Sequence, residues 1–138
     1  MLTIRLPATL SELETYRTWV ADEWGDAPAL EAPADDPAVP APLLALRKAA
    51  LIGGLSFTWY PKPQTPDKGL WINTLLVHPA WRGQGVARQL IAAAEAQARS
   101  VPVVELWVYT ALPRLYQGCG WTPIRETADG RTVLHKAV

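Results

Sequence analysis

The chain has 138 residues, of which 49% are hydrophobic and 19% are charged, so it is long enough for one domain with a sizeable core and too apolar to be disordered. Equal numbers of basic and acidic residues, 13 of each, argue against nucleic acid as the main partner. One cysteine excludes an internal disulfide framework, no apolar run reaches the ~20 residues of a membrane helix, and the N-terminus does not resemble a signal peptide. We therefore expect a single cytoplasmic domain over residues 1–138, with no membrane partner.

The charges are distributed unevenly along the chain. Residues 1–40 hold eight acidic and two basic residues, whereas the other 98 residues hold eleven basic and five acidic ones. An acidic first part and a basic second part would suit one cationic and one anionic ligand. The alternative is that surface charges are segregated by chance.

The first predicted elements are a short strand and a helix. Residues 2–6 alternate between apolar and polar side chains, which indicates a strand. Ser11 and Glu14 have the spacing of a capping box, and Gly25 is a natural end for the helix. The buried face of this helix would carry Leu13, Tyr16, Val20 and Trp24.

A segment rich in proline, alanine and acidic residues follows at 26–42. Its five prolines exclude a continuous helix or a central strand. We expect an extended, mobile surface loop within the domain, because loops of this length are usually functional or disordered. Residues 43–47 and 51–60 then predict a hairpin, in which Gly53-Gly54 indicates a bulge or close backbone packing.

The central stretch of the chain predicts a strand, a glycine turn and a long helix. Residues 70–77 form an apolar run of strand length, and Arg82-Gly83-Gln84-Gly85 is a turn whose backbone can approach a ligand closely. The helix that follows has an apolar face formed by Val86, Leu90, Ile91, Ala94 and Ala98. Unpaired N–H groups and the helix dipole meet where such a helix begins, so the turn predicts an anion site.

The remaining elements complete a mixed α/β domain. Residues 103–109 predict a strand, Pro113 opens a short helix that ends near Gly118, and residues 121–126 and 131–138 predict a closing hairpin. The fold class is therefore α/β, with a mixed sheet flanked by helices.

Two common classes of glycine loop do not fit the central turn. A dinucleotide-binding loop needs a third glycine where Arg88 stands, so an NAD-dependent oxidoreductase is the weaker enzyme hypothesis. A phosphate-binding P-loop needs Lys followed by Ser or Thr after its last glycine, and the sequence has neither.

Two motifs resemble those of the GNAT acetyltransferases. Arg82-Gly83-Gln84-Gly85-Val86-Ala87 fits the family pattern Arg/Gln-x-x-Gly-x-Gly/Ala after a strand, and Leu115-Tyr116-Gln117-Gly118-Cys119-Gly120-Trp121 fits Leu-Tyr-x-x-x-Gly-aromatic. The order of the predicted elements agrees with the family from end to end. The resemblance implies the GNAT fold, with a mostly antiparallel sheet of six to seven strands, and acetyl-coenzyme A (acetyl-CoA) as cosubstrate.

The resemblance also implies which residues hold acetyl-CoA. The pantetheine would lie beside the central strand and pair with its backbone like an added strand. The diphosphate would lie on the backbone N–H groups of the turn and the start of the helix. The cofactor-binding residues are then Leu75, Leu76, Val77, Arg82, Gly83, Gln84, Gly85, Val86, Ala87 and Arg88.

In similar proteins the tyrosine of the second motif protonates the departing thiolate, which makes Tyr116 the expected general acid. Its alternative role is that of a packing aromatic. The strand glutamate that serves many relatives as general base is replaced by Trp107, and the orientation of Glu105 on the same strand cannot be read from the sequence. Glu23 lies at the end of the first predicted helix, near the place where the family binds acceptors, and is the candidate base or acceptor contact. Alternatively, Glu23 forms a surface ion pair, or water removes the proton from the amine.

The expected activity is N-acetylation of an amine by direct attack on acetyl-CoA. Trp24 and Trp107, with Trp59, would line an acceptor pocket, and aromatic faces near carboxylates favour a cationic acceptor. The two histidines have no ligand spacing, so no metal is expected. The alternative function is a non-catalytic CoA-binding sensor or partner module. Either function is compatible with a monomer or a homodimer.

Overall fold

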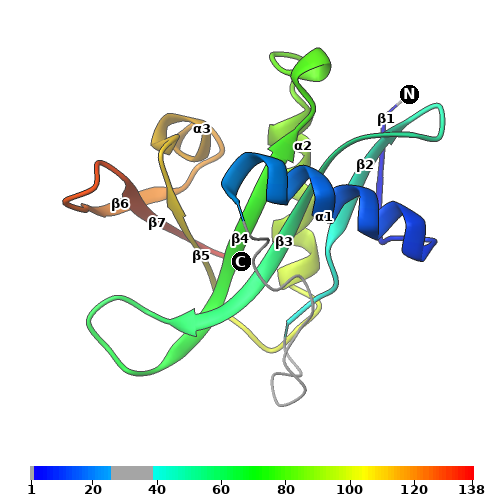
Figure 1. Ribbon diagram of the computed structural model, residues 1–138. Coiled ribbons are helices and arrows are strands. Elements are labelled where there is room, and N and C mark those ends of the chain that lie inside the picture. Colours follow the sequence, from blue (N-terminus) through cyan, green and yellow to red (C-terminus); the bar gives the residue numbers. More distant parts are fainter. Residues whose placement is uncertain (1, 26–38) are drawn as a thin grey trace.

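The computed structural model describes residues 2–25 and 39–138, which form one seven-stranded sheet with helices on both faces (Figure 1). The strand order is β1-β2-β3-β4-β5-β7-β6, and every neighbouring pair is antiparallel except β4 and β5. The strands are β1 Leu2–Arg5, β2 Leu43–Arg47, β3 Ala50–Pro61, β4 Lys68–Val77, β5 Glu105–Thr110, β6 Thr122–Glu126 and β7 Thr132–Ala137. The helices are α1 Leu10–Trp24, the 3-10 turn Pro79–Trp81, α2 Val86–Ala98 and α3 Pro113–Gln117.

This architecture confirms the expected fold class, including the mostly antiparallel sheet. The predicted hairpins and the central strand, turn and helix are all present. The expected loop at 26–42 lies almost wholly outside the described residues, and only its last residues, 39–42, are described, without regular secondary structure. The short turn Pro79–Trp81 has no counterpart in the prediction.

The two faces of the sheet are covered by different helices (Figure 1). On β2, Leu43 and Ala45 pack in the cluster that contains α2, whereas Leu44 and Leu46 pack with Tyr16 of α1. A strand whose successive side chains are all buried must lie between two layers. The protein therefore has a hydrophobic core on each face of the sheet, and the larger one lies between the sheet and α2.

Helix α1 begins two residues earlier than the sequence predicts. Its N-cap is Thr9, whose hydroxyl oxygen accepts a hydrogen bond from the N–H of Glu12 at 3.2 Å. Arg5 also holds the Glu12 carboxylate, at 2.7 Å, so the cap is tied to β1. The predicted capping box of Ser11 and Glu14 is therefore wrong, because Thr9 offers the same chemistry at a position where β1 supplies a second partner.

Helix α2 buries the face that the sequence predicts. Val86, Leu90, Ile91, Ala94 and Ala98 are all buried. Glu95 is buried beside them, and its carboxylate forms an ion pair with Lys136 of β7 at 2.6 Å. This pairing satisfies a charge that would otherwise be costly inside the protein, and it ties α2 to the C-terminal hairpin.

Gly54 on β3 allows the ring of Tyr16 to pack directly on the sheet. A Cβ atom at Gly54 would lie 2.5 Å from Cε1 of Tyr16. The ring itself is fully buried, and its hydroxyl lies 2.9 Å from the Thr74 hydroxyl on β4. The close backbone packing predicted for Gly53-Gly54 is confirmed, and a register shift between β2 and β3 adjoins it.

Gly54→Ala is expected to lower the free energy of unfolding by about 1–3 kcal/mol, because the added methyl group overlaps a ring that cannot move. Chemical denaturation measures this loss. In a Tyr16→Leu background the same substitution should cost much less, since the clashing atoms are gone. Equal costs in both backgrounds would contradict this explanation.

A candidate coenzyme cleft beside the open edge of β4

The second half of β4 has one unpaired edge. β4 pairs with β3 along its whole length, but its parallel ladder with β5 joins only Leu70–Ile72 to Leu106–Val108. The register between β3 and β4 also shifts at this point. Ser56 pairs with Thr74 and Phe57 with Ile72, so the pairing skips Asn73. Backbone groups on the free edge of residues 73–77 are thus available to an extended ligand.

The glycine turn continues from the end of this edge. Gly83 and Gly85 have φ values of +77° and +82°, in the region that side chains disfavour, and no other atoms crowd them within 4 Å of a Cβ position. Gly85 is the N-cap of α2 and provides no side-chain cap. The first N–H groups of α2 therefore have no side-chain cap. The anion site that the sequence places here stays a prediction.

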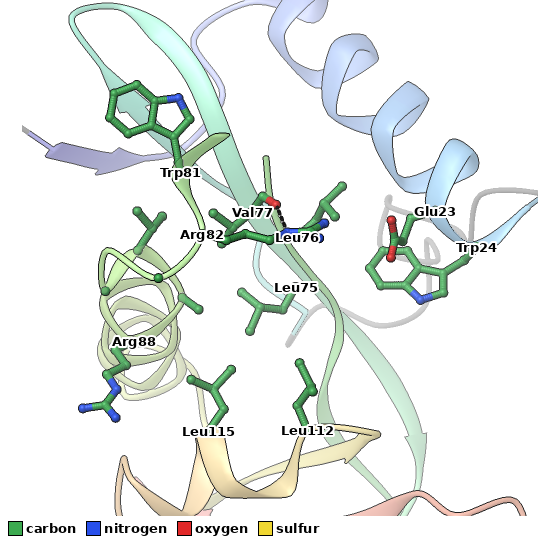
Figure 2. A pocket seen from close by; sticks show the side chains of 14 residues that line it. Glu23, Trp24, Leu75, Leu76, Val77, Trp81, Arg82, Arg88, Leu112 and Leu115 are labelled. Carbon is green, nitrogen blue, oxygen red and sulfur yellow. Dashed lines mark hydrogen bonds between the residues drawn. The ribbon is translucent and has the colours of Figure 1, made fainter. Parts of the chain in front are cut away.

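A cavity of about 680 Å³ joins these two features, and we call it the donor cavity. Leu75, Leu76 and Val77 form one wall, the turn and the start of α2 form another, and Leu112 and Leu115 close it from the α3 side (Figure 2). Nearly all of the predicted cofactor-binding residues line it; Gln84 is the exception. The described residues thus form one continuous cleft from the strand edge to the helix N-terminus.

The two arginines of the turn differ in their contacts. Arg82 donates from Nε to the backbone carbonyl of Val77 at 2.9 Å, which ties the turn to the end of β4 (Figure 2). Arg88 is exposed, and its guanidinium lies near Gly118 at the end of α3. Arg82 therefore holds the turn against the end of β4.

Tyr116 lies beside a second cavity of about 410 Å³, which we call the middle cavity. The two cavities share Leu75, Leu112 and Leu115, so they are adjacent. The Tyr116 side chain is 3% exposed and packs edge-on against Trp121 at 5.2 Å. Burial raises the pKa of its hydroxyl above the ordinary value, so the group is protonated at neutral pH. In the described part of the chain, no hydrogen bond engages this hydroxyl.

The family model for the acetyltransferase (GNAT) family matches residues 5–121. The chain belongs to this family. No curated protein matches the sequence significantly.

Solved GNAT structures have the same fold. NAA60 of Arabidopsis thaliana, in complex with a bisubstrate analogue, has a TM-score of 0.72 at 16% identity, with 99% of this chain and 98% of that chain covered. A GNAT acetyltransferase of Streptococcus pneumoniae has a TM-score of 0.75 at 13% identity, with 100% and 99% covered. Naa50 of Arabidopsis thaliana, with the bisubstrate analogue CoA-Ac-MVNAL, has a TM-score of 0.69 at 13% identity, with 99% of both chains covered.

Glu23 and Trp24 of this GNAT domain come from the end of α1 and line both the donor and the middle cavities (Figure 2). Trp24 is 47% exposed, so the prediction that it lies on the buried face of α1 is wrong. The reason is that α1 packs on the sheet through Tyr16 and Val20 and its last turn extends past the covered strands. The free indole then borders the cleft.

The other predicted acceptor residues are not brought together with Trp24. Trp107 faces the α1 side of the sheet, but it is 8% exposed, stacked on His135 at 4.9 Å, and lines none of the three cavities. Trp59 packs against the core on the α2 side. Glu105 accepts a hydrogen bond from His135 at 2.6 Å and stands at the start of β5, whereas the middle cavity contacts the end of that strand. The pocket of three tryptophans is therefore not formed.

Asn73, Tyr109 and Arg131 line the middle cavity although the sequence analysis does not single them out. Tyr109 follows Trp107 at a spacing of two on β5, so the strand period places both on one face. Arg131 directly follows the predicted turn at Asp129-Gly130. The local sequence pattern thus indicates which face of the sheet Tyr109 lies on. It does not indicate that β4 and β5 separate and leave these residues open to a cavity.

Within residues 2–25 and 39–138, no three His, Cys, Asp or Glu side chains gather in a way that could hold a metal ion. No helix in the described ranges has both the length and the apolar character needed to cross a bilayer.

Proposed function

We propose that this protein is an N-acetyltransferase that moves an acetyl group from acetyl-CoA to a primary amine by direct attack. The observation that carries the proposal is the unpaired edge of β4, which borders one cavity with the glycine turn and a second cavity with Tyr116. The similar structures solved with bisubstrate analogues (CoA-Ac-MVNAL in Naa50) support the same use of the cleft.

The residues of the donor cavity fit acetyl-CoA. The free β4 edge would hold the pantetheine by backbone hydrogen bonds, and the N–H groups of residues 83–88 would hold the diphosphate. The open space around Gly83 and Gly85 supports this, since a ligand can reach the backbone there. When bound, acetyl-CoA supplies an acetyl group activated as a thioester.

The residues of this chain would then act on three atoms. A backbone N–H near Leu76 or Val77 would donate to the acetyl oxygen. As the new N–C bond forms and the C–S bond breaks, Tyr116 would give its proton to the departing sulfur. The proton lost by the amine would go to Glu23 or to water, and the exposed position of Glu23 beside both cavities supports either role.

The experiment that tests this proposal measures thiol release from acetyl-CoA with a panel of primary amines, together with acetyl-CoA binding by calorimetry. We expect binding and amine-dependent thiol release. Binding without turnover on any amine would favour the coenzyme-binding module. If NAD protects the protein from thermal unfolding and CoA does not, the assignment of the turn is wrong.

A further inference from the structure

A third cavity of about 610 Å³, the distal cavity, adjoins the middle cavity on the side away from the glycine turn. Its walls come from the far end of the β3–β4 hairpin and from the β6–β7 hairpin, which extend to the same side of the molecule (Figure 1). The distal and middle cavities share four residues: Ile72, Asn73, Tyr109 and Arg131. A molecule in the distal cavity can therefore reach past Asn73 toward Tyr116.

The distal cavity is lined by positive charge. Lys62, Arg125 and Arg131 line it, and none of the described residues that line it is acidic. In residues 2–25 and 39–138, no carboxylate forms an ion pair with any of these three cations. Three cations without ion-pair partners around one cavity favour an anionic ligand.

Asp129 interacts with Arg131, and its carboxylate also accepts hydrogen bonds from neighbouring groups. It accepts hydrogen bonds from the hydroxyls of Thr127 and Tyr109 and from the backbone N–H of Arg131. The Thr127 hydroxyl and then the Tyr109 hydroxyl lower the pKa of its carboxyl group to about 2. Asp129 therefore offsets part of the Arg131 charge and fixes the turn, but it does not line the cavity.

Two of the three cations, Arg131 and Lys62, have contacts that position their side chains. The Arg131 guanidinium lies 5.4 Å from the centre of the Tyr109 ring. Lys62 lies over Gly69, where a Cβ would be only 2.9 Å from the lysine Cγ, so the glycine leaves room for its side chain. Tyr60 and Trp71 also line the cavity, with ring centres 6.1 Å apart. Side chains positioned in this way lose less freedom when a ligand binds.

The middle and distal cavities are bordered by side chains of opposite charge. Glu23 borders the middle cavity where it meets the donor cavity, and Lys62, Arg125 and Arg131 border the distal cavity. Building on the proposed function, we propose that the acceptor carries a carboxylate as well as its amine. Arg131, with Lys62 and Arg125, binds the carboxylate, and the amine lies toward Glu23 and Tyr116. This replaces the cationic acceptor that the acidic N-terminal part of the sequence favours.

The test compares acceptors that differ only in the carboxylate: 4-aminobutyrate with 4-aminobutanamide, and phenylalanine with phenethylamine. We expect kcat/KM to be about tenfold or more higher for the carboxylate member of at least one pair, because a charged hydrogen bond is lost with the other. Arg131→Gln should reduce that preference by a similar factor, and Lys62→Gln with Arg125→Gln should reduce it further. Added salt should also reduce the preference for the acceptor with the carboxylate, because it screens the attraction between the charges.

The matched control is Arg99→Gln, an exposed arginine at the end of α2 that lines none of the three cavities. It should keep the preference of the wild type, and thermal unfolding should show that every variant folds. The carboxylate proposal would be overturned if the acceptors without a carboxylate were turned over equally well or better, or if Arg131→Gln kept the preference unchanged. Neither result would contradict the proposed acetyltransferase activity. No turnover with any amine, despite acetyl-CoA binding, would overturn both.

Discussion

Replacing Tyr116 with Phe should lower kcat by about a hundredfold or more, because general acid catalysis typically contributes 10²–10⁴-fold. The substitution removes one oxygen from a buried ring that packs against Trp121, so the fold and the donor cavity are kept. Steady-state thiol release, with acetyl-CoA affinity measured separately, checks the result. We expect kcat to fall while the dissociation constant for acetyl-CoA changes little.

Tyr16→Phe is the matched control for this variant. Tyr16 is also fully buried with a raised pKa, but its hydroxyl is bonded to Thr74 and lines none of the three cavities. Its loss should cost about 1 kcal/mol of stability and leave kcat nearly unchanged. Similar losses of kcat in both variants would show that buried hydroxyls matter here only for packing.

The raised pKa of Tyr116 also predicts the pH profile. A proton donor is active while protonated, and burial raises its pKa above the ordinary value of 10. Loss of rate through ionisation of Tyr116 is therefore expected only above pH 10, so any fall in rate between pH 7 and 10 must come from another group. A fall in that range that disappears in Tyr116→Phe would contradict the assignment.

Gly85→Val should weaken acetyl-CoA binding by about ten- to a hundredfold. The φ of +82° at Gly85 is one that a β-branched residue rarely adopts, and forcing or abandoning it costs about 1–3 kcal/mol. The turn would then relax away from the geometry that exposes the first N–H groups of α2. Calorimetric titration with acetyl-CoA measures the change.

Gly130→Val is the control for this second prediction. Gly130 has a φ of +83° and equally open surroundings, but it lies in the β6–β7 turn and lines none of the three cavities. Its backbone strain should be similar, so its melting temperature should fall by a similar amount. Only Gly85→Val should also weaken acetyl-CoA binding. Equal weakening in both variants would mean that general instability, and not the turn, causes the loss.

The sequence predicts the elements well where the chain interacts with itself locally. The apolar face of α2 and the glycine turn are both determined by residues within a few positions. The N-cap of α1 is also a local feature, but the sequence predicts it at Ser11 and the structure has it at Thr9. Thr9 and Ser11 offer the same hydroxyl, and the choice between them depends on Arg5, which reaches Glu12 from β1.

The acceptor side could not be predicted in the same way because it depends on where two strands separate. No local pattern indicates that the β4–β5 ladder ends at Ile72 and Val108. That separation brings Tyr109 and Arg131 to the middle cavity while Trp107, two residues earlier, stays packed under Trp71 and His135. Residue types therefore predict the donor side, whereas the residues around the middle cavity become apparent only from the three-dimensional arrangement.

The short β4–β5 ladder has a mechanical consequence. Its three residue pairs join one part of the sheet, β1–β4, to the other, β5–β7, and the Glu95–Lys136 ion pair also ties α2 to β7. Lys62 and Leu75 lie on the first part, and Arg131 and Tyr116 follow the second. A rotation of one part of the sheet against the other would therefore change the width of the donor cavity and the spacing between Lys62 and Arg131 at the same time.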